Sequence, residues 1–113
     1  MALITIEYTV PANTPKSNLN KQSFDLGVNA RVINSCQVII PVGHKGLAYM
    51  RAFTPGFQLI PSSGSSAPFV RGDDTTLSAD ISRPMEGPPY NLYCEGYNED
   101  LYLPHTFIIN LGV

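Results

Sequence analysis

Proline and glycine divide this chain into short pieces. The sequence has 10 Pro and 9 Gly among 113 residues, and its longest piece without either runs from Val28 to Ile40. Pro lacks the backbone donor that a helix interior needs, and Gly in a helix costs conformational entropy, so long helices cannot extend across these positions. The piece Val28–Ile40 is rich in β-branched residues, which pack well on a pleated sheet. The sequence therefore predicts a chain of short strands.

Apolar and polar residues alternate at both ends of the chain. Because successive side chains of a strand point to opposite faces, this alternation predicts strands with one buried face. The apolar positions are Ile4, Ile6, Tyr8 and Val10 at one end and Phe107, Ile109, Leu111 and Val113 at the other. Turn-forming Gly, Pro, Asn and Asp bound six further expected strands, near residues 22–26, 30–40, 47–53, 57–60, 75–81 and 90–97.

Eight short strands without a helical period predict an all-β protein. In one small domain spanning residues 1–113, the expected architecture is a single eight-stranded β-sandwich of the jelly-roll type. An immunoglobulin-like sandwich is the alternative, but the chain has no Trp to pack against a bridging disulfide. We expect residues 60–68 to form a flexible loop and residues 9–20 an extended arm outside the sandwich that could reach an adjacent subunit.

Composition excludes several classes of partner. Charged residues make up 14% of the chain, against roughly 25% in an average soluble domain, which suggests that part of the surface is covered. The net charge is −2 and the seven Lys and Arg are scattered, so we expect no nucleic-acid binding. We also expect no membrane span, because no apolar run approaches about 18 residues. The first residues do not resemble a signal peptide, which predicts synthesis in the cytoplasm.

Cysteine and histidine form no recognisable catalytic pattern. Cys36 and Cys94 share the parity of apolar neighbours, so both thiols should face inward as inert core groups, although a disulfide between them stays open. His44 and His105 lie in turn contexts without a motif that would activate a nucleophile. Enzyme activity is therefore the least favoured class of function, and no cofactor is expected.

Two pairs of acids could suit an oxygen-loving cation. They are Asp73–Asp74 and Glu99–Asp100, and neither lies in a loop with the ligand spacing of a known calcium site. Acids at a turn more often bind backbone N–H groups or water. We expect no metal site, and a pair of glycosidase carboxylates would need a separation that sequence does not provide.

The tripeptide Arg71-Gly72-Asp73 is typical of a turn. An adhesion motif is the other interpretation, but Gly-Asp-Asp between two strand-like stretches is ordinary turn chemistry. The turn would place Arg71 and Asp73 at the same exposed end of the sandwich, where a partner could pair with both.

Four of the six Tyr lie between residues 90 and 102. Tyr93 and Tyr97 have the opposite parity to the apolar residues of their strand, which places them on its outer face. Tyr is enriched in interfaces, although a cross-strand ladder that only stabilises the sheet is the alternative. We also expect Asn98, Glu99 and Asp100 to be exposed. The candidate partner-binding residues are Arg71, Asp73, Tyr93, Tyr97, Asn98 and Asp100.

Turn and loop segments recur along nearly the whole chain, at Tyr8–Lys16, Gly46–Leu47, Gln58–Pro61, Gly72–Asp74, Gly96–Asp100 and Pro104–Thr106. Together these segments resemble those of small all-β virion proteins from phages of bacteria or archaea. The resemblance implies a jelly-roll-like sandwich and a structural role as a capsid decoration, cement or minor capsid protein. It implies no catalytic or metal-binding residue.

These observations lead to two functional expectations. The first is a virion structural protein that contacts the major capsid protein or other virion proteins and forms a homo-oligomer, with a trimer attractive because it suits a threefold axis. An N-terminal strand with one charge, Glu7, could pair with a neighbouring molecule or with the C-terminal strand. The second is a carbohydrate- or receptor-binding module, in which Tyr97 would stack on a sugar ring.

Overall fold

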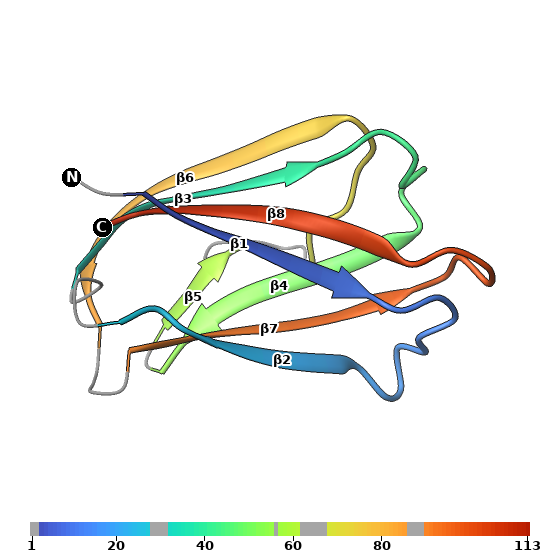
Figure 1. Ribbon diagram of the computed structural model, residues 1–113, viewed down its shortest axis with the longest axis horizontal. Helices are drawn as coiled ribbons and strands as arrows, with labels where there is room; N and C mark the ends of the chain where they lie inside the picture. Colours follow the sequence, from blue (N-terminus) through green and yellow to red (C-terminus); the bar gives the residue numbers. More distant parts are fainter. Residues whose placement is uncertain (1–2, 28–31, 56, 62–67, 86–89) are drawn as a thin grey trace.

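Eight strands form the framework of the protein. The computed structural model describes residues 3–27, 32–55, 57–61, 68–85 and 90–113, and within these ranges there is no helix (Figure 1). The strands are β1 (Leu3–Val10), β2 (Asn20–Asp25), β3 (Val32–Ile40), β4 (Ala48–Thr54), β5 (Phe57–Ile60), β6 (Thr75–Pro84), β7 (Asn91–Asn98) and β8 (His105–Gly112). All eight expected strands are present, and their bounds differ from those expected by up to three residues.

The strands make two antiparallel sheets of four. One sheet, named sheet A, has the order β1-β8-β3-β6, and sheet B has the order β2-β7-β4-β5. The two sheets lie as facing layers in Figure 1, and most connections carry the chain from one layer to the other. The all-β expectation is confirmed. The N-terminal strand pairs along its whole length with the C-terminal strand, from Leu3 opposite Gly112 to Val10 opposite His105.

Alternate residues of the strands fill the space between the sheets. Phe107, Ile109 and Leu111 of β8 are fully buried, as expected from their parity. Cys36 and Cys94 are also fully buried and are not bonded to each other. Burial raises the pKa of both thiols to about 12. Because the thiolate is the reactive form, these cysteines act as core side chains at neutral pH.

Tyr8 crosses the core and joins the two sheets. Its hydroxyl donates a hydrogen bond of 3.0 Å to the carbonyl of Asn20 on β2. The ring passes beside Gly96 of β7, where an added Cβ would lie 3.1 Å from the Tyr8 hydroxyl and 2.5 Å from the carbonyl oxygen of Tyr49. Since real Cβ atoms do not approach backbone oxygens so closely, this position requires glycine.

The loops β1–β2, β3–β4 and β7–β8 gather at one end of the sandwich, on the right of Figure 1, where β6 also begins. The expected arm is wrong, because residues 9 and 10 belong to β1, and Asn13 and Thr14 are bonded to the end of β7 and the turn after it. Asn13 N–H donates to the carbonyl of Asp100 at 2.7 Å, and Asn98 N–H donates to the carbonyl of Thr14 at 3.0 Å. These backbone groups are satisfied within the molecule. The expected flexible loop falls mainly on residues 62–67, outside the described residues.

Candidate functional site

Large apolar side chains are exposed in the turn between β7 and β8. This segment, residues 99–104, is named the β7–β8 turn. The exposed fractions are 60% for Leu101, 86% for Tyr102 and 59% for Leu103. Three neighbouring large apolar residues with this exposure are costly in water and are typical of a surface that another molecule covers.

The buried side chain of Asn98 is hydrogen-bonded to the β7–β8 turn. The expectation of an exposed Asn98 is wrong, because the residue is only 1% exposed. Its amide nitrogen donates to the carbonyl of Leu103 at 3.0 Å and to that of Val10 at 3.4 Å. Its amide oxygen accepts from the backbone N–H of Asp100 at 2.9 Å. The side chain points inward because the last residues of β7 keep the strand alternation, and polar groups of the turn meet it there.

Asp100 is half-buried rather than exposed, and both of its carboxylate oxygens have partners in the turn or in the first residue of β8. One oxygen accepts from the N–H groups of Tyr102 and Leu103, at 3.0 and 3.1 Å. The other lies 2.8 Å from Nε2 of His105. The N–H of Tyr102 and the His105 side chain hold the pKa of Asp100 below its usual value. Asp100 therefore fixes the shape of the turn and leaves the apolar tips to face outward.

A second histidine, His44, packs against His105 at the same end of the sandwich. The rings of His44 and His105 are centred 4.6 Å apart, and His44 is 3% exposed. Nε2 of His44 lies 2.9 Å from the carbonyl of Thr106, so Nε2 carries the hydrogen and Nδ1 remains without a partner. Burial lowers the pKa of His44, and the neighbouring His105 lowers it further. The hydrogen bond to Thr106 opposes this shift, and the net effect favours the neutral form of the ring.

Arg71 and Asp73 are both exposed in the loop before β6, as expected, but they face different partners. The Asp73 carboxylate accepts from the N–H of Gly43 at 2.7 Å, and backbone N–H groups of Lys45 and Gly43 lower its pKa. Arg71 instead donates to the hydroxyl of Tyr49 at 2.6 Å. Asp73 thus ties two loops together, whereas Arg71 belongs to the outer face of sheet B.

Aromatic pairs lie along the outer face of sheet B. Tyr49 of β4 stacks on Tyr97 of β7, with ring centres 4.3 Å apart and planes 9° apart, and Phe53 stacks on Tyr93 at 5.7 Å. Each pair joins residues directly opposite each other across β4 and β7. The outer-face placement of Tyr93 and Tyr97 is confirmed. The pairs form the cross-strand ladder that was the alternative to an interface.

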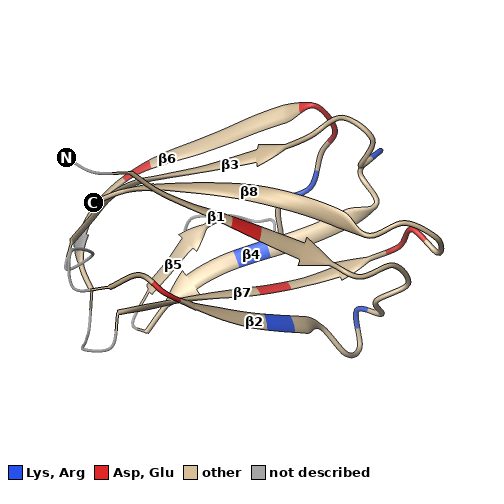
Figure 2. Cartoon of the chain, in the orientation of Figure 1, with Lys and Arg blue, Asp and Glu red and all other residues tan. Residues whose placement is uncertain are grey.

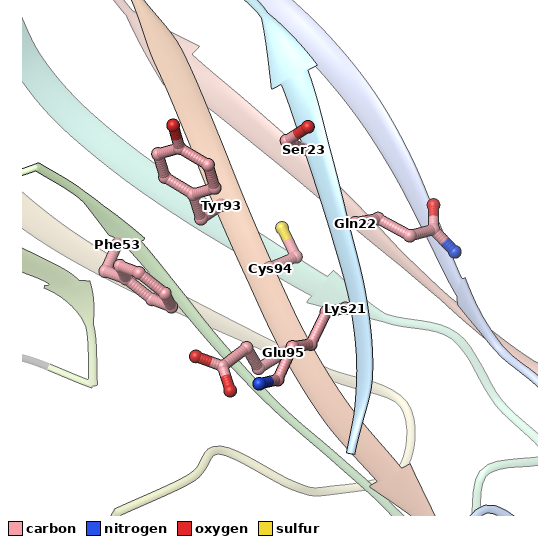
Figure 3. Close-up of a pocket in the computed structure, with 7 residues that line it drawn as sticks. All are labelled: Lys21, Gln22, Ser23, Phe53, Tyr93, Cys94 and Glu95. Carbon is pink, nitrogen blue, oxygen red and sulfur yellow. The ribbon is translucent and has the colours of Figure 1, made fainter. Parts of the chain in front are cut away.

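A hollow of about 220 Å³ lies beside the Phe53–Tyr93 pair. In Figure 3, Phe53, Tyr93, Glu95 and Lys21 lie on one side of the sheet, while Gln22 points away from them. The amide of Gln22 donates to the carbonyl of Thr9 on β1 at 3.3 Å. It therefore helps to cover the edge between the two sheets and is not free for a ligand.

Cations surround the other aromatic pair. The Lys16 ammonium lies 5.9 Å from the centre of the Tyr97 ring, and the Arg71 guanidinium lies 5.3 Å from that of Tyr49. Phe69 meets Tyr97 edge-on at 5.2 Å and lies under the guanidinium of Arg51 at 4.9 Å. We call Lys16, Tyr49, Phe69, Arg71 and Tyr97 the cation–aromatic cluster. Partial burial and the neighbouring Tyr49 raise the pKa of Tyr97.

Sequence reasoning found Arg71 and Tyr97 but missed the other members of this cluster. Phe69 and Arg71 reach it because Val70 pairs with Met50, through hydrogen bonds of 2.8 and 3.1 Å, and extends sheet B beside β4. The alternation of β4 places Tyr49 on an outer face, and this pattern was the signal in the sequence that could have identified Tyr49. The pairing of Val70 with Met50 leaves no signal in the sequence.

Two open grooves flank the cluster. One, of about 440 Å³, is lined by Lys16, Tyr49, Leu77, Tyr97 and residues 68–71, and the other, of about 450 Å³, by residues 13–16, Tyr49 and residues 97–99. In the described part of the chain, no group of three or more His, Cys, Asp or Glu could hold a metal ion. None of the same residues forms a helix long and apolar enough to cross a membrane.

No protein-family model matches the chain, and no curated protein matches it.

Proposed function

We propose that this chain is a jelly-roll structural protein of a virus particle, as a capsid decoration, cement or minor capsid protein. It acts through protein–protein contacts, with copies of itself and with the major capsid protein or another virion protein. A closed homo-oligomer such as a trimer is the expected unit, since closed symmetry is the rule for such assemblies.

The strand order supports the jelly roll. Two four-stranded antiparallel sheets with the orders β1-β8-β3-β6 and β2-β7-β4-β5 arise when the chain crosses repeatedly between facing layers. An eight-stranded double sheet of this kind is the architecture of many viral capsid and lectin domains. The fold narrows the class of protein, but the proposed role in protein–protein contacts is argued from the surface residues.

The observation that carries the proposal is the β7–β8 turn. Leu101, Tyr102 and Leu103 are exposed, yet the hydrogen bonds of Asn98 and Asp100 fix the backbone beneath them. A rigid apolar projection loses little entropy when a partner covers it, which favours tight binding. Large apolar and aromatic side chains of this kind are the usual anchors of protein interfaces.

Sedimentation velocity of the purified chain tests the contact role. We expect an oligomer at micromolar concentration, or binding to purified virus shells, and loss of either in the combined variant Leu101→Ser, Tyr102→Ser, Leu103→Ser. The matched control is Leu3→Ser, Val32→Ser, which removes exposed apolar residues from the opposite end of the sandwich (Figure 1). A monomer of 12.3 kDa that also fails to bind shells would overturn the proposal.

A carbohydrate-binding module is the second candidate, favoured by the grooves beside Tyr49 and Tyr97. Against it, Tyr49 covers one face of the Tyr97 ring and the Lys16 ammonium lies over the ring, so less of the ring is offered to a sugar. A glycan array distinguishes the two. Selective glycan binding that Tyr97→Ala abolishes would favour the carbohydrate-binding module.

A further inference from the structure

The cation–aromatic cluster contains two cations that no acid neutralises. Arg51, beside the cluster, forms an ion pair of 3.3 Å with Glu95. Neither Lys16 nor Arg71 has a carboxylate within ion-pair distance among the residues that the structure describes. In Figure 2, Lys and Arg mark β2 and β4 of sheet B, and an acid marks β7 between them. The cation–aromatic cluster itself holds two positive charges in a chain whose net charge is −2.

Each of the two cations lies over an aromatic ring. Lys16, Tyr97, Tyr49 and Arg71 follow one another in a row, through contacts of 5.9, 4.3 and 5.3 Å. The hydrogen bond of 2.6 Å from Arg71 to the Tyr49 hydroxyl orients the guanidinium. Since the backbone of Val70 is hydrogen-bonded to Met50 in both directions, the loop is held in place at the residue before Arg71. A cation held in this way loses little conformational entropy when it binds an anion.

The groove of about 440 Å³ brings charge and apolar surface together. Lys16 and Arg71 stand at its walls, and Phe69 and Leu77 add apolar surface. Such a groove suits a ligand that carries carboxylates on an extended, partly apolar backbone. Arg in particular matches the planar carboxylate with two parallel donors.

We propose that this groove binds an acidic, extended peptide segment of a partner protein, with Arg71 and Lys16 binding its carboxylates. The inference rests on the proposed function only in taking the partner to be a protein. Two free cations beside Glu99 are too few for the phosphates of a nucleic acid, which require a longer basic surface. For a sugar, Tyr49 already covers one face of the Tyr97 ring and Lys16 lies over the same ring, which reduces the surface for stacking.

Titration of the ¹⁵N-labelled chain with a synthetic peptide tests the site. The probe is an acetylated heptapeptide with four Glu and one central Pro, and the comparison peptide has Gln in place of every Glu. We expect saturable chemical-shift changes at Lys16, Tyr49, Phe69, Arg71 and Tyr97 for the acidic peptide, weakened by added salt. Equal binding of the Gln peptide would overturn the proposal.

Matched charge variants separate a local site from overall electrostatics. Lys16→Gln, Arg71→Gln should weaken binding about tenfold or more. Lys21→Gln, Lys45→Gln removes the same charge from residues that do not line the groove and should leave affinity unchanged. Unchanged spectra outside the substituted positions show that each variant is folded. Equal weakening by both pairs, or tighter binding of an oligouronate or of oligothymidylate than of the peptide, would overturn the assignment. Peptide binding by a chain that is absent from particles would overturn only the virion proposal.

Discussion

The side-chain amide of Asn98 donates to the carbonyl of Leu103 at 3.0 Å, and so connects the end of β7 to the exposed part of the β7–β8 turn. The same side chain also binds Val10 and Asp100. Asn98→Ala removes three hydrogen bonds and leaves buried polar groups without partners. We expect the free energy of unfolding to fall by about 1–3 kcal/mol, measured by urea denaturation.

An exposed asparagine provides the control. Asn18→Ala changes a residue in the exposed β1–β2 segment and should leave the urea midpoint nearly unchanged. If Asn98→Ala lowered the free energy of unfolding no more than Asn18→Ala does, the turn would not depend on the buried amide. A rigid apolar projection would then lose its structural basis.

His44 makes stability depend on pH. Its pKa is lowered in the folded protein from an ordinary value of 6.5, by burial and by the facing His105, against the opposing effects of the Thr106 carbonyl and Asp73. Below pH 6.5 the unfolded chain therefore binds more protons than the folded one, so stability falls as pH decreases. Asp100 and Asp73 act in the same direction only at lower pH, because their pKa values lie below 3.8 in the folded state.

The variant His44→Gln separates these contributions. Its amide can still donate to the carbonyl of Thr106, but it does not titrate. We expect the free energy of unfolding to change less between pH 7.5 and 5.5 in the variant than in the natural chain, measured by urea denaturation at each pH. Parallel pH profiles for the two proteins would show that folding does not change the pKa of His44, and would contradict this prediction.

Gly96 should not tolerate even alanine. A Cβ at this position would lie 2.5 Å from the Tyr49 carbonyl and 3.1 Å from Val10. Overpacking of this kind costs about 1–3 kcal/mol, so the melting temperature of Gly96→Ala should decrease clearly. The comparison is Gly27→Ala, where no atom lies within 4 Å of the added Cβ but φ is +79°, so that variant measures backbone strain without a clash. A normal melting temperature for Gly96→Ala would mean that β7 and β4 can separate without cost.

Ile109→Ala tests the core. The residue is fully buried on the inner face of β8, and its truncation should cost about 2–5 kcal/mol. Ile108 lies on the opposite face and is half-buried, so Ile108→Ala should cost less. Urea midpoints of the two variants are the measurement. A larger loss of stability in Ile108→Ala than in Ile109→Ala would mean that Ile108, and not Ile109, faces the core.

Strand positions and core parity could be predicted from the sequence because they depend on local patterns. Alternation places Tyr8, Cys36 and Ile109 inward whatever the strands pair with. Turn chemistry at Pro and Gly marks the ends of the strands. The expectation for residues 11–19 is wrong because their composition resembles a linker, while their backbone hydrogen bonds go to Asn98 and Asp100, far along the chain.

The surface was harder to predict because it depends on contacts between distant residues. Nothing in the sequence shows that Arg71 lies against Tyr49, since the loop before β6 reaches β4 through the pairing of Val70 with Met50. The inward direction of Asn98 follows from strand parity. A polar residue near a turn nevertheless suggests exposure, and for Asn98 that suggestion is wrong.

Quantitative mass spectrometry of virus particles tests the central claim most directly. The particles are purified by density gradient from the culture that produces this chain, and its copy number is measured relative to the major shell protein. The account predicts that the chain sediments with intact particles at a constant ratio across preparations. Recovery of the chain only in the soluble cell fraction, with none in the particle band, would contradict it.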